Sequence, residues 1–236
     1  MRVVKFGGSS LATGTSVNQA LEIILADPSR QVMVVSAPGK RNSSDIKVTD
    51  LLIKYAKTVL NYQNYSKIVD EIYSRYQEIG HFFGLDETQL NIIKDILLSL
   101  PESSYPTDDY LIAAFKAHGE RLNARLIAMI LNQKGIKTKY LDPHEAGLTV
   151  TGEPNDAIVS PETYLNLDKI KIDSDEHIIF PGFFGITPSG HIATFSRGGS
   201  DITGAILAKG LHADLYENFT DVNGIFAANP AIIDHP

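Results

Sequence analysis

The chain has 236 residues, of which 43% are hydrophobic and 21% are charged, and its formal net charge is −7. This length and composition suit one large α/β domain, or a domain with an insertion, that buries a full core. The acidic balance argues against nucleic acid or an anionic membrane as the main partner, and the lack of cysteine in the sequence excludes disulfides, thiolate nucleophiles and zinc–thiolate sites.

The first 36 residues predict a β-α-β unit. Residues 2–6 are expected to form a strand, and the apolar stretch there is too short for a signal peptide, so we expect a cytoplasmic protein. Gly14-Thr15-Ser16 provides the start of a helix, which Asp27-Pro28 ends. The apolar run within Gln31–Ser36 indicates a strand buried on both faces, so we expect parallel pairing through a right-handed crossover.

A helical insertion is expected next. After a loop over residues 37–44, the pattern is helical from Thr49 to about Ile130, with breaks near 61–65, 80–86 and 101–106. We interpret about 50–130 as an insertion on the sheet domain, ending in a long helix that crosses Gly119. Its tyrosines could stack on nucleic acid, but acids mixed among the lysines favour core and helix-packing positions for Tyr55, Tyr62, Tyr65, Tyr73 and Tyr76.

The last third returns to strands. We expect strands over Lys137–Leu141 and His177–Phe180, with a short hairpin or irregular crossing between residues 142 and 161. A further strand at His191–Phe195, a helix from Asp201 and a strand at Ala213–Tyr216 fit a second β-α-β unit. The whole pattern predicts an α/β domain with a mainly parallel sheet.

Two of the predicted strands run into paired glycines. The first segment is Lys5-Phe6-Gly7-Gly8-Ser9-Ser10, and the second is Ser196-Arg197-Gly198-Gly199-Ser200-Asp201 at the start of a helix. Glycine lets the backbone approach an anion closely, and a helix N-terminus adds unpaired N–H groups and a partial positive charge. Arg197 adds a planar fork suited to carboxylate or phosphate. The pattern is therefore typical of phosphate handling.

Together the two segments resemble the amino-acid kinase family, and within it the aspartokinases. The resemblance continues, in family order, through Val35-Ser36-Ala37-Pro38-Gly39, His118-Gly119-Glu120-Arg121, Pro181-Gly182-Phe183 and Thr220-Asp221-Val222-Asn223-Gly224-Ile225. It implies a three-layer α/β/α sandwich, with residues 1–236 as a catalytic domain truncated at its C-terminus. It also implies a homo-oligomer in the intact protein and regulatory ACT-type domains that this chain lacks.

The reaction implied by the resemblance moves the γ-phosphoryl group of ATP, with Mg²⁺, onto the side-chain carboxylate of L-aspartate. The product is 4-phospho-L-aspartate, and the step opens the pathway to lysine, threonine and methionine. An aspartate side chain is already ionised at pH 7, so the protein has to bring two anions together rather than supply a base.

The resemblance also assigns residues to this reaction. Lys5 contacts the transferring phosphoryl group and Asp201 orients Lys5. The substrate-binding residues are Arg197 for the α-carboxylate, Glu120 for the α-amino group, and Ser36, Thr49 and Ser200; a serine at 43 or 44 could take the part of Thr49. The nucleotide-binding residues are Lys5, Gly7, Gly8, Ser9, Thr220, Asp221 and Phe226. No protein ligand is assigned to the metal.

The sequence departs from the family near its end. Ala231 stands where an arginine is frequent, and a lysine of the nucleotide site is expected beyond Pro236, so we expect weak ATP binding and low activity from these residues alone. Alternatives are a relative acting on N-acetylglutamate, glutamate or a nucleotide monophosphate, or a ligand-binding module without activity. A dinucleotide oxidoreductase is disfavoured because neither glycine pair forms G-x-G-x-x-G.

Overall fold

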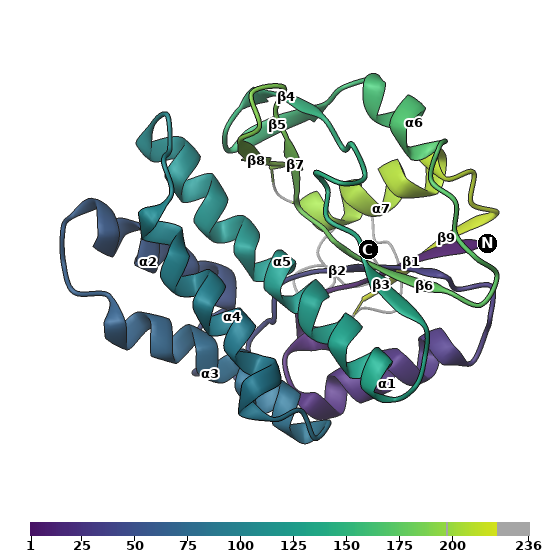
Figure 1. The fold of residues 1–236 in the computed structure, drawn as a ribbon, viewed down its shortest axis with the longest axis horizontal. Coiled ribbons are helices and arrows are strands. Elements are labelled where there is room, and N and C mark those ends of the chain that lie inside the picture. The colour runs from purple at the N-terminus through teal and green to yellow at the C-terminus, as the bar shows by residue number, and fades with distance from the viewer. Residues whose placement is uncertain (197, 221–236) are drawn as a thin grey trace, which may run out of the picture.

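The structure, a computed structural model, describes residues 1–196 and 198–220, and a parallel sheet lies at its centre (Figure 1). The sheet has five strands, and every neighbouring pair in it runs parallel. This confirms the predicted mainly parallel sheet. In spatial order the strands are β3 (Thr138–Tyr140), β6 (His177–Pro181), β2 (Val32–Val35), β1 (Arg2–Phe6) and β9 (Leu215–Phe219).

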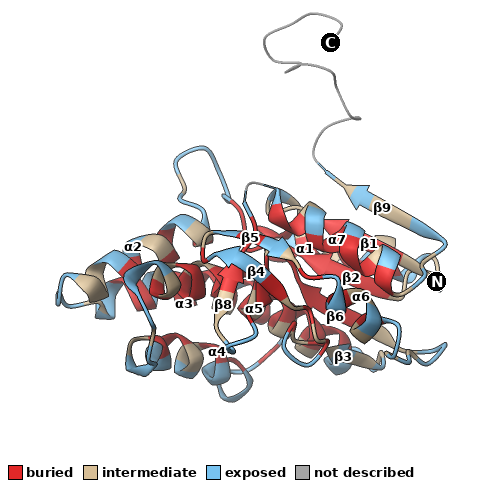
Figure 2. Cartoon of the chain, turned by 90° about the horizontal axis from the view of Figure 1, so that it is seen from above, coloured by how far each residue is buried: buried red, intermediate tan, exposed pale blue. Residues whose placement is uncertain are grey.

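Helices cover both faces of the sheet. Alternate residues of β1 and β2 point to opposite sides, so that Val4 and Met33 join one core cluster and Val3 and Val32 join the other. The first cluster packs against α1 (Gly14–Leu25) and α5 (Asp108–Gln133), and the second against α6 (Glu162–Leu167) and α7 (Gly199–Gly210). The result is the expected three-layer arrangement, with buried residues concentrated in the sheet and on the helix faces toward it (Figure 2).

The helical insertion lies to one side of the sheet, at the left of Figure 1. It consists of α2 (Val48–Leu60), α3 (Ser66–Phe82), α4 (Glu87–Ser99) and the short 3-10 helix η2 (Leu100–Glu102), and it leads into α5. The breaks fall where turn and cap residues predict them. Asp86 caps α4 together with Gln89, and the Thr107 hydroxyl accepts a hydrogen bond from the backbone of Tyr110 at the start of α5.

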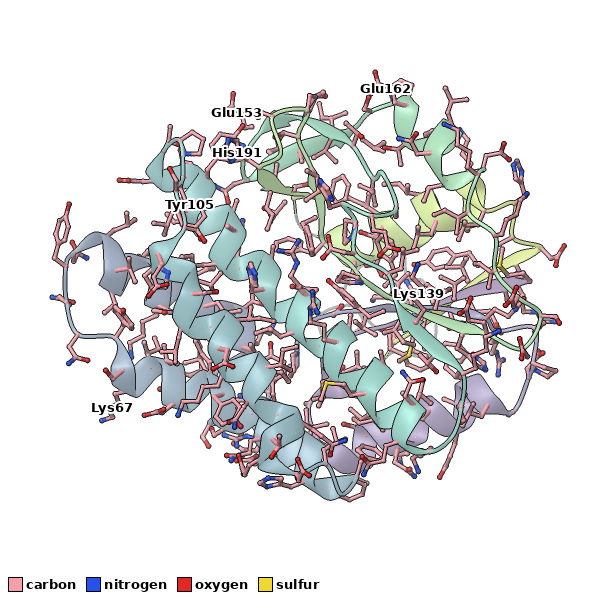
Figure 3. The ribbon with its side chains drawn as sticks, viewed as in Figure 1. Lys67, Tyr105, Lys139, Glu153, Glu162 and His191 are labelled. Atoms are coloured by element: carbon pink, nitrogen blue, oxygen red, sulfur yellow. The ribbon has the colours of Figure 1, made fainter. Side chains whose placement is uncertain are left out.

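Most tyrosines of the insertion are core residues, as predicted. Tyr55, Tyr73 and Tyr76 are buried, and Tyr65 packs against the same cluster. The prediction was wrong for Tyr62, whose side chain is almost fully exposed in the turn after α2 with a φ of 55°. The neighbouring stretch of α3 also faces solvent on one side, where Lys67 points outward (Figure 3).

The predicted second β-α-β unit is wrong in its first strand. A strand does form within His191–Phe195, as β8 (Ile192–Thr194), but it pairs antiparallel with β7 (Phe184–Ile186) outside the central sheet. The reason lies just after β6, where Gly182 and Phe183, with a φ of 79°, turn the chain away from the sheet. The expected hairpin after β3 is present, formed by β4 (Val150–Glu153) and β5 (Asp156–Val159).

Within the described part of the chain, no helix combines the length and the apolar character needed to cross a membrane.

Candidate active site

The carboxyl ends of β1 and β2 bring two loops into close contact. Since parallel strands end at the same edge of a sheet, ligands commonly bind there in α/β proteins. The backbone N–H of Gly39 donates to the carbonyl oxygen of Gly8 at 2.8 Å, and that of Ser36 donates to Phe6 at 3.3 Å. A Cβ on Gly39 would lie 2.6 Å from the carbonyl carbon of Gly8. Glycine is therefore required for the two loops to meet.

The second glycine segment faces the first through an ion pair. Lys5 Nζ, at the end of β1, lies 2.7 Å from Oδ1 of Asp201 in the first turn of α7. Gly198 starts that turn with a φ of 80°, and Asn218 Nδ2 donates to the same carboxylate oxygen at 3.1 Å. A Cβ on Gly7 would lie 3.7 Å from Lys5 Nζ. The prediction that an ammonium from one glycine turn faces an acid from the other is confirmed.

A cavity in two lobes surrounds this pair. We call the first the glycine lobe; it has a volume of about 480 Å³, and the second, the α7 lobe, about 340 Å³. Residues found in the glycine lobe alone are Gly7, Gly8, Ser9, Ala37, Pro38, Gly39, Lys40 and Thr220. Residues found in the α7 lobe alone are Asp50, Phe183, Gly198, Gly199, Ser200 and Asp201. The residues that line both lobes are Lys5, Ser36, Lys47, Thr49 and Glu120.

Glu120 is an acid buried in the wall of the cavity. It lies on α5, is only 5% exposed, and its Oε2 has no hydrogen-bond partner among residues 1–196 and 198–220. Burial raises its pKa to about 8, although the backbone N–H of Ala37 donates to it. A buried carboxyl with one unpartnered oxygen in a polar cavity can bind a ligand cation, because an ammonium would stabilise its ionised form.

Other residues of α5 and α3 support this wall. The Asn123 side chain donates to the carbonyl oxygen of Ser36 at 2.7 Å, and the Tyr76 hydroxyl donates to that of Gly119 at 3.0 Å. His118 lines neither lobe. Its Nδ1 donates to the Ala114 carbonyl at 2.7 Å, and burial, with a smaller effect from Arg121, lowers its pKa to about 3. His118 is therefore neutral and structural.

The structure brings together all ten predicted site residues that it describes: Lys5, Gly7, Gly8, Ser9, Ser36, Thr49, Glu120, Ser200, Asp201 and Thr220. Thr49 lines both lobes, whereas Ser43 and Ser44 line neither, so the geometry favours Thr49 over the serines. Arg197, Asp221 and Phe226 lie outside the described residues. No group of three or more His, Cys, Asp or Glu side chains suited to a metal occurs in residues 1–196 and 198–220.

Sequence reasoning missed several residues of the site. Lys40 and Lys47 line it from the loop after β2, and Phe183 lines the α7 lobe from a strained backbone position. The lysines carry no local signal, since most residues of the loop between β2 and α2 are polar or charged. Phe183 follows a Pro-Gly pair, which marks a turn but not the strain.

The whole chain matches a known protein family. The amino acid kinase family model matches residues 1–236, so the chain belongs to the amino acid kinase family. Within the family the chain is similar to aspartokinases. Aspartokinase 3 of Bacillus subtilis (strain 168) is 46% identical over 236 residues, which are 100% of this chain and 52% of that protein. Lysine-sensitive aspartokinase 3 of Escherichia coli (strain K12) is 26% identical over 239 residues, covering 98% of this chain and 51% of that protein.

Solved structures agree with this similarity. The aspartate kinase of Clostridium acetobutylicum superposes with a TM-score of 0.78 at 33% identity, covering 100% of this chain and 51% of that chain. Escherichia coli aspartokinase III, in its complex with aspartate and ADP, superposes with a TM-score of 0.82 at 24% identity, covering 99% of this chain and 52% of that one, which shows a shared fold. The chain thus spans about half the length of the curated relatives it matches.

Proposed function

We propose that these residues form the catalytic region of an ATP-dependent aspartate kinase. The observation that carries the proposal is the Lys5–Asp201 pair at 2.7 Å, placed where a glycine-lined lobe meets a second lobe, with the buried acid Glu120 in the wall that the two lobes share. Glycine loops with unhindered backbone suit phosphate oxygens, and the unpaired acid suits an amino group. The aspartokinase relatives and the family model support the same activity.

The acceptor is best explained as a free amino acid. Glu120 Oε2 has no partner in the described residues and lies in the wall shared by both lobes. The α-ammonium of aspartate would supply that partner, with Ser36, Thr49 and Ser200 around the rest of the molecule and Arg197 proposed for the α-carboxylate. N-acetylglutamate has no ammonium and would leave Glu120 unpaired, which costs binding free energy. The site therefore favours aspartate over that acceptor.

The transfer needs no general base. A side-chain carboxylate oxygen of aspartate forms a bond to the γ-phosphorus of ATP, the bond from that phosphorus to the bridging oxygen breaks, and ADP leaves with the electron pair. Lys5 would hold charge on the phosphoryl oxygens, and Asp201 would keep its ammonium oriented. Gly7, Gly8, Ser9 and Thr220 would line the phosphates. Mg²⁺, when bound with ATP, would neutralise part of the phosphate charge.

The proposed function also has consequences for the domain organisation and the cellular location of the intact protein. Residues 1–236 would be the catalytic domain, with the helical insertion within it and ACT-type regulatory domains in the intact protein. We propose a cytoplasmic homo-oligomer whose product supplies the routes to lysine, threonine and methionine.

Trapping of the acyl phosphate tests the activity. The purified protein encoded by the full gene is incubated with ATP, Mg²⁺ and hydroxylamine, together with aspartate, glutamate or N-acetylglutamate in separate reactions. We expect the hydroxamate only with aspartate and only when ATP is present. Equal yield from N-acetylglutamate, or aspartate binding without any hydroxamate, would rule out the proposed function.

A further inference from the structure

Lys47 lines both lobes of the cavity and has no part in the proposed function so far. The other four residues common to the lobes are Lys5, Ser36, Thr49 and Glu120. The ammonium of Lys47 forms no ion pair or hydrogen bond with any residue in 1–196 or 198–220. A phosphoryl group that moves from one lobe to the other has to cross their shared boundary, so an exposed cation on that boundary stands beside its path.

The charges around this boundary leave a need for a cation. Lys5 is already paired with Asp201, while Asp50 adds an acid to the α7 lobe. Two anions, the phosphoryl group and the acceptor carboxylate, then have to approach each other. Lys116 does not serve, because its ammonium lies 5.3 Å from the centre of the Phe183 ring and it lines neither lobe.

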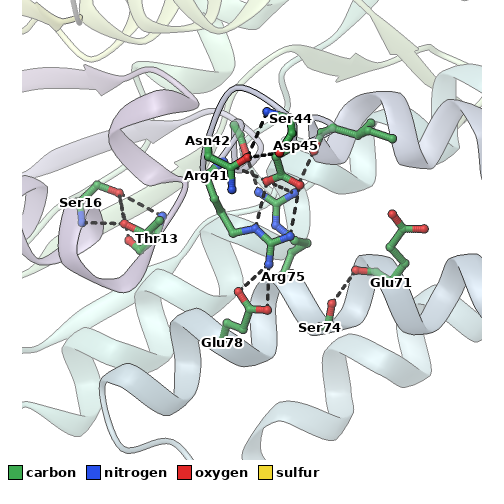
Figure 4. Close-up of polar contacts among 12 residues, drawn as sticks. Thr13, Ser16, Arg41, Asn42, Ser44, Asp45, Glu71, Ser74, Arg75 and Glu78 are labelled. Carbon is green, nitrogen blue, oxygen red and sulfur yellow. Dashed lines mark hydrogen bonds and ion pairs between the residues drawn. The ribbon is translucent and has the colours of Figure 1, made fainter.

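Arg75 of α3 packs against the loop of residues 36–47, which carries Lys47, and Figure 4 shows Arg75 together with Asp45 of that loop. The side chain of Arg75 is buried in α3 and donates to the carbonyl oxygens of Gly39 at 2.5 Å and Ile46 at 2.8 Å, at the two ends of the loop. It also pairs with Asp45 at 3.0 Å. Ile46 directly precedes Lys47, so these contacts fix the backbone from which the Lys47 side chain extends.

Asp45 is committed to arginines and cannot neutralise Lys47 at the same time. Arg41 donates to Asp45 from both its backbone and its side chain, at 2.9 Å and 3.0 Å, and binds Glu78 through two bonds of 2.8 Å and 2.7 Å (Figure 4). Asp45 and Glu78 are therefore occupied by arginines, and neither neutralises the charge of Lys47.

We propose that Lys47 is a further catalytic residue, whose ammonium contacts the phosphoryl group as it passes to the acceptor, and that Arg75 is the positioning residue that holds the Lys47 loop. The proposal rests on the proposed function. The bonds that form and break are those of the proposed transfer, and Lys47 gives up no proton. Its ammonium stabilises the negative charge on the peripheral phosphoryl oxygens.

The test compares lysines in the protein encoded by the full gene. Lys47→Ala is expected to lower kcat about 100-fold with the Kd for aspartate changed less than threefold, because the contact is made in the transition state. Lys47→Arg, which keeps the charge, is expected to recover at least a tenth of the lost rate. The variant Lys40→Ala, in the same loop but lining the glycine lobe alone, is expected to act mainly on KM for ATP and to lower kcat less than Lys47→Ala does. Lys54→Ala, an exposed charge on α2, is expected to change neither.

A binding measurement separates this role from a structural one. ADP, aluminium fluoride and aspartate together mimic the transferring group, and Lys47→Ala is expected to weaken this ternary complex at least 30-fold while ADP alone and aspartate alone bind as before. A kcat within threefold of the parent, or a loss confined to KM for aspartate, would overturn the proposal. If the parent enzyme phosphorylates another acceptor, the proposed function fails, but the same variants measured with that acceptor still decide the part of Lys47.

Arg75 is tested through its dependence on Lys47. Arg75→Lys keeps the charge and loses the fork that reaches both carbonyl groups, so we expect kcat to fall about tenfold in the parent and less than twofold in the Lys47→Ala background. Asp45→Asn replaces it if Arg75→Lys does not fold. Equal losses in the two backgrounds would show that Arg75 acts independently of Lys47 and would overturn its positioning role.

Discussion

Glu120 is expected to lower the stability of the fold at neutral pH and to bind the amino group of the proposed substrate. Glu120→Gln should therefore make the fold more stable and bind aspartate more weakly. In the wild-type protein, burial raises the pKa of Glu120 from an ordinary 4.5 to about 8. The folded state therefore binds one proton more than the unfolded chain between pH 4.5 and pH 8. The free energy of unfolding should be unaffected by this group below pH 4.5, should fall as the pH rises from 4.5 to 8, and should change no further above pH 8.

The size of the effect follows from the buried position of Glu120. When the folded state holds one extra proton, the free energy of unfolding falls by about 1.4 kcal/mol for each unit that the pH rises. The wild-type fold is therefore about 3 kcal/mol less stable at pH 7 than at pH 4.5 through this group. Glutamine has the shape of the protonated acid and takes up no proton. Its amide places two N–H donors where the protonated acid has a single O–H without a partner, and the additional unpartnered donor costs about 1 kcal/mol. Glu120→Gln should therefore be more stable than wild type by about 2 kcal/mol at pH 7, and not more stable near pH 4.5.

Urea unfolding at pH 5, 6, 7 and 8 measures this difference. The control Glu71→Gln changes an exposed acid on α3 and should leave the pH dependence of the wild type intact. An unchanged slope in Glu120→Gln would mean that another group holds the proton, and the reasoning from burial would be refuted.

For aspartate binding the order is reversed: the wild-type protein should bind aspartate more tightly than the more stable Glu120→Gln variant. An ammonium binds the ionised form of Glu120, so aspartate should release a proton on binding at pH 7, and its affinity should rise by up to tenfold per pH unit between pH 6 and pH 8. Calorimetry in phosphate and in Tris detects the released proton. Glu120→Gln should lose at least 30-fold in affinity despite its greater stability. Retained affinity would show that Glu120 is not the partner of the amino group.

Three further changes test the site and its surroundings. Lys5→Met should lower kcat by about 10³-fold in the hydroxamate assay and leave the fold intact by circular dichroism, since the lost cation acts on the phosphoryl group. Gly39→Ala should reduce the free energy of unfolding in urea by about 1–3 kcal/mol, because its Cβ would meet Gly8 at 2.6 Å; Gly7→Ala, whose Cβ would approach only the Lys5 ammonium at 3.7 Å, should cost less than half as much. Tyr62→Gly should raise the free energy of unfolding by about 0.5–1 kcal/mol, as its side chain is 98% exposed at a φ of 55° and glycine adopts this conformation without strain.

The parts of the fold that local pattern specifies could be predicted from the sequence. Hydrophobic runs and spacing predicted β1, β2 and β6 and the breaks between α2, α3, α4 and α5. The partner of β8 could not be predicted, because three residues of alternating character fit an antiparallel hairpin as well as a parallel sheet. Its true partner is set by the turn at Phe183, whose left-handed backbone no sequence pattern indicates for an aromatic residue.

The candidate site likewise contains residues that the sequence indicates and residues that only the packed structure identifies. Lys5 and Asp201 could be predicted because each belongs to a glycine segment that resembles those of the amino-acid kinase family. Arg75 was missed although a signal existed: it lies among Ile68, Ile72, Tyr76 and Ile79 on the buried face of α3, where a charged residue requires a buried partner. Its partners are carbonyl groups of a loop some 30 residues earlier, which only the packed structure identifies. A charged residue within an apolar stripe thus predicts that a polar segment packs there, but not which segment, and in this protein that segment carries Lys47 to the boundary between the two lobes.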